Sequence, residues 1–197
     1  MKRTLTITLL LILFSFIALF LNADFMTHFE EWIYTKSVEP MSSPLTISVK
    51  TVTHAGDAVT VTAICLFLFV IPKLKKNFAV TITLTVAIAE IANLILKPIF
   101  ARERPQILHL VAETSYSFPS GHAMASAAFY GCIALLVWQN ISHRQTKIIT
   151  ALFCFIITFL IGLSRVYLGV HYITDVIGGW CLGLAIATAA TNKKRAS

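Results

Sequence analysis

Three short polar clusters interrupt an otherwise apolar chain, and their residue types suit phosphate chemistry. The clusters are Lys97 with Arg104-Pro105, then Ser120-Gly121-His122, then Ser164-Arg165 with His171 and Asp175. Charged and titratable side chains are costly at a bilayer, so their presence there calls for a function. Cations hold phosphate oxygens, and histidine transfers protons or attacks as a nucleophile. The clusters therefore predict a phosphate site.

In the first cluster, Lys97 and Arg104 lie seven residues apart at the exit of an apolar segment. Lysine is a point charge and arginine a planar fork, so the pair can hold different oxygens of one phosphate. The alternative is a pair of interfacial anchors that extend from a helix end toward water. Arg102 carries the same two interpretations.

The second cluster precedes an apolar run and is typical of a helix start. Ser120 is a good N-cap residue, and Gly121 lets a ligand approach the backbone. The free amides and the helix dipole attract anions at this end. His122 in the first turn can reach the same anion and carry a proton. The alternative is a capped helix start with a passive histidine.

The third cluster holds the most specific pattern. His171 and Asp175 are four residues apart, so on a helix they share a face and can touch. A carboxylate bonded to one ring nitrogen leaves the other nitrogen basic, which is how a nucleophile is oriented. Arg165 adds a third cation nearby. The alternative is a structural histidine–aspartate pair that caps a helix.

Composition places these clusters in a membrane protein. The 197 residues are 57% hydrophobic and 13% charged, and the mean hydropathy is +0.79. A membrane span needs about 20 apolar helical residues, and helices satisfy their own backbone groups in lipid. We predict an all-α bundle of six transmembrane helices, forming a single domain over residues 1–197. The predicted spans are Leu5–Ala23, Ala55–Ile71, Phe78–Leu96, His122–Trp138, Ile148–Leu163 and Ile173–Thr191.

Charge placement predicts the orientation. If both termini are cytoplasmic, ten of the 16 lysines and arginines fall on that side, as the positive-inside rule requires. These ten are Lys2, Arg3, Lys73, Lys75, Lys76, Arg144, Lys147, Lys193, Lys194 and Arg195. All three polar clusters then lie at the outer face. The charge of +7 follows this topology, and no basic surface for nucleic acid is apparent.

The remaining segments give weaker predictions. The first apolar run is longer than the roughly 7–15 apolar residues of a cleaved signal peptide, which favours an uncleaved anchor. Between the first two spans, an aromatic stripe at helical spacing predicts a short helix that either lies in the interface or caps the bundle. The stripe is Phe25, Phe29, Trp32 and Ile33.

Isolated polar residues give three further predictions. Asp57 is expected at the outer rim or as a helix cap, and Asn93 is expected to form a hydrogen bond with a neighbouring helix. Glu90, deep in the third span, needs a hydrogen-bond partner, and the four cysteines suit packing.

Taken together, the spacing of the three clusters resembles the signature of the type 2 phosphatidic acid phosphatase family. Six residues separate Lys97 from Arg104-Pro105, Pro119 precedes Ser120-Gly121-His122, and five residues separate Arg165 from His171. The resemblance covers all three motifs and, through the six-helix plan, nearly the whole chain. It implies a phosphatase that needs no metal or other cofactor and forms a phosphohistidine intermediate.

The resemblance also implies a role for each site residue. His171 would attack phosphorus, Asp175 would orient His171, and His122 would protonate the leaving oxygen. The remaining residues, Lys97, Arg104, Arg165, Ser120 and Gly121, would hold the phosphate oxygens. Three cations and a helix N-terminus can supply the charge stabilisation that phosphoryl transfer requires.

A site between helix ends at the outer interface favours a lipid substrate. In this family, small members act on phosphatidylglycerol phosphate, phosphatidate or polyprenyl diphosphate, and the lysine-rich inner loops and the short chain fit a bacterial plasma membrane. A phosphotransferase on the same scaffold is the main alternative. A transporter would place polar residues through several helices, where only Glu90 qualifies, and the soluble vanadate peroxidases that share the anion-binding motifs are not membrane proteins.

Overall fold

A computed structural model of the protein describes residues 2–71, 76–107 and 109–191. Regular structure in these ranges consists of eight α-helices and a short 3-10 helix, η1, so the predicted all-α class is confirmed. The elements are α1 (Lys2–Leu19), α2 (Asp24–Val38), α3 (Ser43–Thr53), η1 (His54–Gly56), α4 (Ala58–Leu68), α5 (Lys76–Phe100), α6 (Gly121–Asn140), α7 (Arg144–Tyr167) and α8 (Ile173–Ala190).

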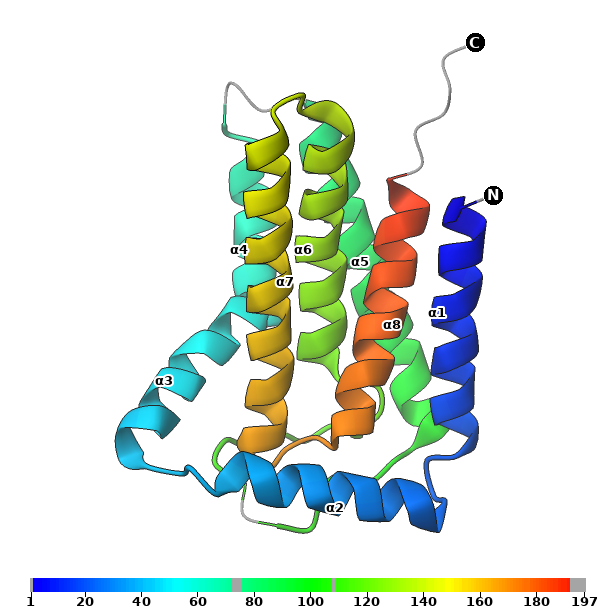
Figure 1. Ribbon diagram of the computed structural model, residues 1–197, viewed down its shortest axis with the longest axis vertical. Helices are drawn as coiled ribbons and strands as arrows, with labels where there is room; N and C mark the ends of the chain where they lie inside the picture. The colour runs from blue at the N-terminus through cyan, green and yellow to red at the C-terminus, as the bar shows by residue number, and fades with distance from the viewer. Residues whose placement is uncertain (1, 72–75, 108, 192–197) are drawn as a thin grey trace.

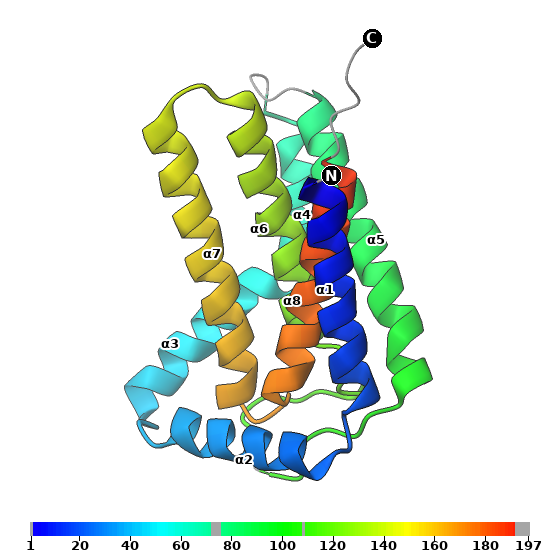
Figure 2. The ribbon, with the colours of Figure 1, turned by 45° about the vertical axis from the view of Figure 1, so that its right-hand side comes forward.

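The long helices stand side by side, and α2 lies across one end of the bundle (Figures 1 and 2). At the opposite end α1 begins and α8 finishes, and Arg3 Nη1 donates to the Thr191 carbonyl at 2.9 Å. The start of α1 and the end of α8 therefore share one face of the molecule. Of the cations that predict the orientation, Lys73, Lys75, Lys193, Lys194 and Arg195 lie outside the described residues.

Five helices, α1, α5, α6, α7 and α8, have the length and apolarity of membrane spans. The second predicted span is different, because α4 has only 11 residues. It passes the same test together with α3 and η1, which meet it at 50°. Asp57 is extended at the break, with φ −65° and ψ 138°, so the predicted span over Ala55–Ile71 contains a bend near its start that the sequence did not indicate. This is the architecture of a multi-pass membrane protein.

Helices α6 and α8 form the buried centre of the bundle, and small residues bring their backbones together. A Cβ atom added at Gly183 would lie 2.4 Å from the Met124 carbonyl oxygen, and one at Gly179 would lie 2.7 Å from the Ser120 carbonyl oxygen. Small residues four apart are typical of close helix pairs in membranes. The pair fixes the starts of α6 and α8, where the second polar cluster and Asp175 of the third cluster lie.

Helix α2 combines both predicted roles. Phe25, Phe29 and Trp32 are exposed on one face, as expected for an interfacial helix. Met26 and Glu30 on the other face are buried against the bundle. Ile33, predicted on the lipid-facing stripe, instead packs near Val166 and Ile173. The helix therefore caps the bundle while it presents an aromatic face to its surroundings.

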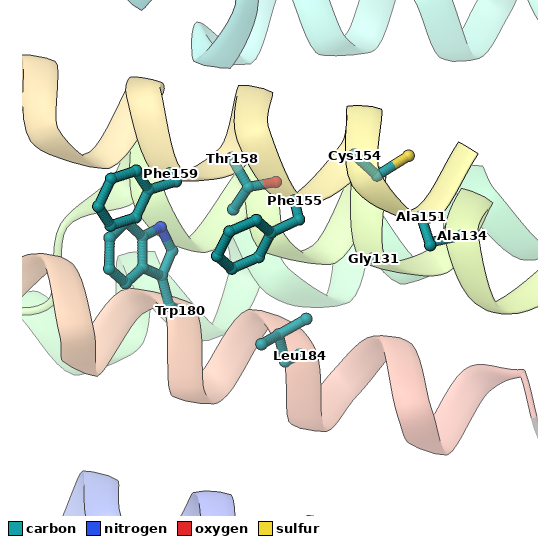
Figure 3. Close-up of a pocket in the computed structure, with 9 residues that line it drawn as sticks. All are labelled: Gly131, Ala134, Ala151, Cys154, Phe155, Thr158, Phe159, Trp180 and Leu184. Atoms are coloured by element: carbon teal, nitrogen blue, oxygen red, sulfur yellow. The ribbon is translucent and has the colours of Figure 1, made fainter. Parts of the chain in front are cut away.

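An apolar groove of about 220 Å³ runs between α6, α7 and α8 (Figure 3). Phe159 and Trp180 stack along it with ring centroids 5.7 Å apart. Small residues, Gly131, Ala134 and Ala151, form its far end. The four cysteines are free and buried within the helices. None of the predicted phosphate-site residues lines this groove, so the chemistry lies elsewhere.

Candidate active site

The turn between α7 and α8 holds the histidine–aspartate pair. Gly169 has φ 75°, a left-handed conformation that glycine adopts without strain, and it reverses the chain after α7. His171 lies two residues before α8 begins, outside the helix as in the predicted span Ile173–Thr191, so the two residues do not share a helix face. Their contact is nevertheless made: His171 Nδ1 is 3.4 Å from Asp175 Oδ2, and both side chains are buried.

Asp175 is held by more partners than His171. Ser117 Oγ donates to Asp175 Oδ2 at 2.5 Å, and the Tyr172 amide donates to the same oxygen at 2.9 Å. Arg102 Nη1 donates to Asp175 Oδ1 at 2.6 Å. Since Oδ2 is directed to His171 Nδ1, the other ring nitrogen is left available, and His171 Nε2 lies 3.3 Å from Arg104 Nη1.

Burial also sets the protonation of this ring. It lowers the pKa of His171 to about 4, although the Asp175 carboxylate opposes the shift. The imidazole is therefore neutral at pH 7. A neutral ring with its Nδ1 held by a carboxylate has a lone pair on Nε2, which is the form that a nucleophile needs.

Arg104 and Arg165 meet at a residue that the sequence analysis missed, Glu113. Arg104 Nη2 donates to Glu113 Oε2 at 3.3 Å, and Arg165 Nη2 donates to Glu113 Oε1. Burial alone would raise the pKa of Glu113, but Arg165 and Arg104 hold it below its ordinary value. A carboxylate thus bridges the two guanidinium groups, as an oxyanion ligand would.

The N-terminus of α6 borders this cluster. Ser120 is the N-cap residue, as predicted, but its hydroxyl makes no cap bond. Ser120 Oγ and Arg165 Nε are buried and have no hydrogen-bond partner. Gly121 is close to Asn93, whose Nδ2 donates to the Pro119 carbonyl at 3.0 Å. The Ser120 hydroxyl at this helix start is thus a buried donor that could bind an anion.

His122 and Asp57 form a second acid–imidazole pair. His122 Nε2 is 2.5 Å from Asp57 Oδ1, and Asp57 Oδ2 is 2.6 Å from His54 Nδ1. Asp57 therefore orients His122, in addition to starting α4. The proximity of Asp57 and His122 comes from the bend between α3 and α4, which the sequence did not predict.

Lys97 reaches the site through the loop that links α5 and α6. It lies in the last turn of α5, beyond the predicted helix end, and Nζ donates to Ser115 Oγ at 2.9 Å and to the Tyr116 carbonyl at 2.6 Å. Arg104 Nε donates to the Ser115 carbonyl at 2.7 Å. The two cations of the first motif thus share one loop segment without direct contact between their charged groups.

Other polar residues fall outside the cluster or take a different part in it. Tyr167 bonds Thr46 and His109 bonds Pro105, so neither contacts the arginines of the site. Arg102, whose predicted roles were a phosphate ligand or an anchor, binds carboxylates instead. Within the described part of the chain, no group of three acidic, histidine or cysteine side chains is arranged to hold a metal ion.

Known proteins are similar to this chain in sequence. A phosphatidylglycerophosphatase B of Bacillus subtilis is 44% identical over 98 residues, which are 48% of this chain and 47% of that protein. An undecaprenyl-diphosphatase of Sulfolobus acidocaldarius is 33% identical over 122 residues, 59% of this chain and 55% of that protein. The chain thus spans about half the length of these curated relatives.

A solved structure matches over nearly the full length. The crystal structure of a transmembrane PAP2-type phosphatidylglycerolphosphate phosphatase from Bacillus subtilis superposes with a TM-score of 0.85 and 28% identity, and the match covers 94% of each chain. Residues 78–196, which contain all three polar motifs, match the family model of the PAP2 superfamily. With the motifs, the bundle and these matches in agreement, the chain belongs to the PAP2 superfamily.

Proposed function

We propose that the protein is a metal-independent phosphatase of lipid phosphates or diphosphates that works through a phosphohistidine intermediate. The observation that carries this proposal is that two of the four buried polar side-chain atoms without a hydrogen-bond partner in the described residues, Ser120 Oγ and Arg165 Nε, belong to the predicted phosphate-binding residues. They lie in a cluster where Arg104 approaches His171 Nε2 and Arg104 and Arg165 share a carboxylate ligand. A phosphoryl group in place of that carboxylate would meet both arginines and the free hydroxyl.

In the first step, His171 Nε2 attacks phosphorus. The phosphorus–nitrogen bond forms as the bond to the leaving oxygen breaks, and His122 donates a proton to that oxygen. Arg104, Arg165, Ser120 and the Gly121 amide hold the remaining oxygens, and Lys97 adds positive charge from the α5 end. Positioning and charge stabilisation supply most of the catalysis in such a transfer.

In the second step, His122 accepts a proton from a water molecule. The water oxygen attacks phosphorus, the phosphorus–nitrogen bond breaks, and inorganic phosphate leaves with His171 neutral again. The 2.5 Å contact with Asp57 supports His122 as a proton carrier, because a carboxylate stabilises the protonated ring. Asp175 stabilises the charged adduct of His171 in the same way.

The placement of the site supports a lipid substrate at the outer face of the cell membrane. The site lies at the end of the bundle where α2 caps it, opposite the start of α1 (Figure 1). The lysine and arginine distribution favours cytoplasmic termini. Relatives are named for phosphatidylglycerophosphate and undecaprenyl diphosphate, so either headgroup class is a candidate here.

The test is phosphate release from phosphatidylglycerol phosphate, phosphatidate and undecaprenyl diphosphate in detergent, with a chelator and without an added alcohol acceptor. Release under these conditions supports a hydrolase, whereas a strict requirement for an acceptor supports a phosphotransferase. Brief reaction with ³²P-labelled substrate should leave an acid-labile, base-stable label on the protein.

His171→Ala should abolish both turnover and labelling. His28→Ala is the matched control, because the His28 side chain is 81% exposed on α2, and it should behave like the unmodified enzyme. Near-normal phosphate release by His171→Ala would overturn the mechanism, and loss of activity with chelator would overturn the metal-independent part.

A further inference from the structure

Helix α2 brings a buried carboxylate to the edge of the active site. Helix α2 lies across the end of the bundle (Figure 2) and exposes Phe25, Phe29 and Trp32, but its Glu30 side chain is only 3% exposed. Glu30 and His171 line the same cavity of about 190 Å³, between α2 and the turn before α8. A buried carboxylate needs a partner, because desolvation of an unpaired charge is costly.

The partner of Glu30 is Arg102. Arg102 Nη2 lies 2.8 Å from each of the two Glu30 carboxylate oxygens, and Thr174 Oγ1 donates to Glu30 Oε1. The Arg102 guanidinium also lies over the Tyr172 ring, 4.1 Å from its centroid. The side chain is 9% exposed, so the arginine is fixed on several sides.

The same guanidinium holds the carboxylate that orients His171. Arg102 Nη1 donates to Asp175 Oδ1 at 2.6 Å and to Thr174 Oγ1 at 2.9 Å. With Oδ1 taken by Arg102, the other oxygen, Oδ2, faces Ser117 and His171 Nδ1. The planar guanidinium of Arg102 therefore joins the Glu30 carboxylate on α2 to the Asp175 carboxylate on α8.

We infer that Glu30 and Arg102 are positioning residues for the reaction: Glu30 fixes the fork of Arg102, and Arg102 fixes the Asp175 carboxylate so that Oδ2 is directed at His171. This inference rests on the proposed function, in which His171 is the nucleophile. Neither residue contacts the phosphate cradle formed by Arg104, Arg165 and Ser120. Their effect is thus on the reactivity of His171 and not on substrate binding.

A double-mutant cycle separates this role from simple anchoring of α2. Glu30→Gln keeps the shape but removes the charge, and it should lower kcat about tenfold with KM within about twofold of the unmodified enzyme. In an Asp175→Asn background, the same substitution should lower kcat less than about twofold, because the group it positions has already lost its charge. Glu31→Gln is the matched control, since its side chain is 72% exposed on the same helix.

Arg102→Lys is the second variant, because it keeps a buried positive charge but loses the fork that reaches two carboxylates. It should lower kcat, and Glu30→Gln should then add little to it. An equal loss from Glu30→Gln in both backgrounds, or a kcat equal to that of Glu31→Gln, would overturn the inference. If His171→Ala retained turnover, the proposed mechanism would fail instead, whatever the cycle showed.

Discussion

The Ser120 amide donates a hydrogen bond to the Asp175 carbonyl at 3.0 Å. This bond joins the N-terminal ends of α6 and α8, so the start of the second polar motif is fastened directly to the third. Residues that are 55 positions apart in the chain, 120 and 175, are thereby held in a fixed relation. The close packing of the two helices below this point maintains that relation.

Gly183→Ala should destabilise the protein because it forces this helix pair apart. The new Cβ would lie 2.4 Å from the Met124 carbonyl oxygen, and backbone cannot move away as a side chain can. We expect a loss of about 1–3 kcal/mol in stability, measured as a lower thermal midpoint in detergent. Gly131→Ala is the control, because its Cβ would meet the end of the flexible Leu184 side chain at 2.9 Å. Equal midpoints for the two variants would contradict the role of this contact.

Asp175→Asn should lower kcat about 10²- to 10⁴-fold, as loss of a carboxylate behind a histidine does in other enzymes. The amide cannot stabilise a positive imidazole adduct, and it can hold the wrong tautomer. Phosphate release at saturating substrate is the measurement. Adding Asp175→Asn to His171→Ala should lower the residual background rate by no more than about threefold, since the two residues act as a unit. Additive losses would argue against the pairing.

The pH dependence of activity should report His171. Burial lowers the pKa of His171 to about 4, while Asp175 acts in the opposite direction. A proton on this ring blocks attack, so the unmodified enzyme should lose kcat/KM as the pH falls toward 4. In Asp175→Asn the opposing carboxylate charge is gone, the pKa falls further, and the loss moves to lower pH.

The ratio of kcat/KM between the unmodified enzyme and Asp175→Asn cancels the ionisation of the substrate. This ratio should fall as the pH drops below about 5, because His171 is protonated at a higher pH in the unmodified enzyme than in Asp175→Asn. A ratio that stays constant or increases between pH 6 and pH 3.5 would show that His171 does not control the loss of kcat/KM at low pH.

Glu113→Gln should strengthen inhibition by inorganic phosphate. The Glu113 carboxylate bridges Arg104 and Arg165, so an incoming anion must replace it at both guanidinium groups. Without that negative charge, the inhibition constant for phosphate should fall about 3- to 10-fold, equivalent to roughly 1 kcal/mol. Glu103→Gln, an exposed acid in the same loop, should leave the constant unchanged. An unchanged constant in Glu113→Gln would show that the carboxylate does not compete with phosphate.

The sequence predicted the helical bundle and the residues of the three motifs because both leave local signals. Long apolar runs mark spans, and clustered cations beside His122 and His171 mark a phosphate site. The bend between α3 and α4 left a weaker signal, since one apolar run continues from Ala55 to Ile71 while the break occurs inside it, at Asp57. Hydropathy counts apolar residues and does not report the direction of the chain.

The partners of Asp175 and of the arginines around the site could not be predicted for a different reason. Glu30 is 72 residues from Arg102 in sequence, and it lies off the aromatic stripe of α2. Helical periodicity assigns a residue to a face, but only the packing of α2 against the turn before α8 decides that this face is buried. Ser117 and Glu113 belong to an irregular loop, where periodicity gives no information.

Helix α1 supports the catalytic end of the molecule through aromatic rings. Phe14 stacks on Phe118 with centroids 5.4 Å apart, and Phe118 in turn meets Phe100 edge-on at 4.9 Å. Phe118 immediately precedes Pro119 and Ser120. An apolar helix that is exposed over most of its length thus supports the loop that leads into the second polar motif, so a substitution in α1 can lower activity while every proposed catalytic residue is intact.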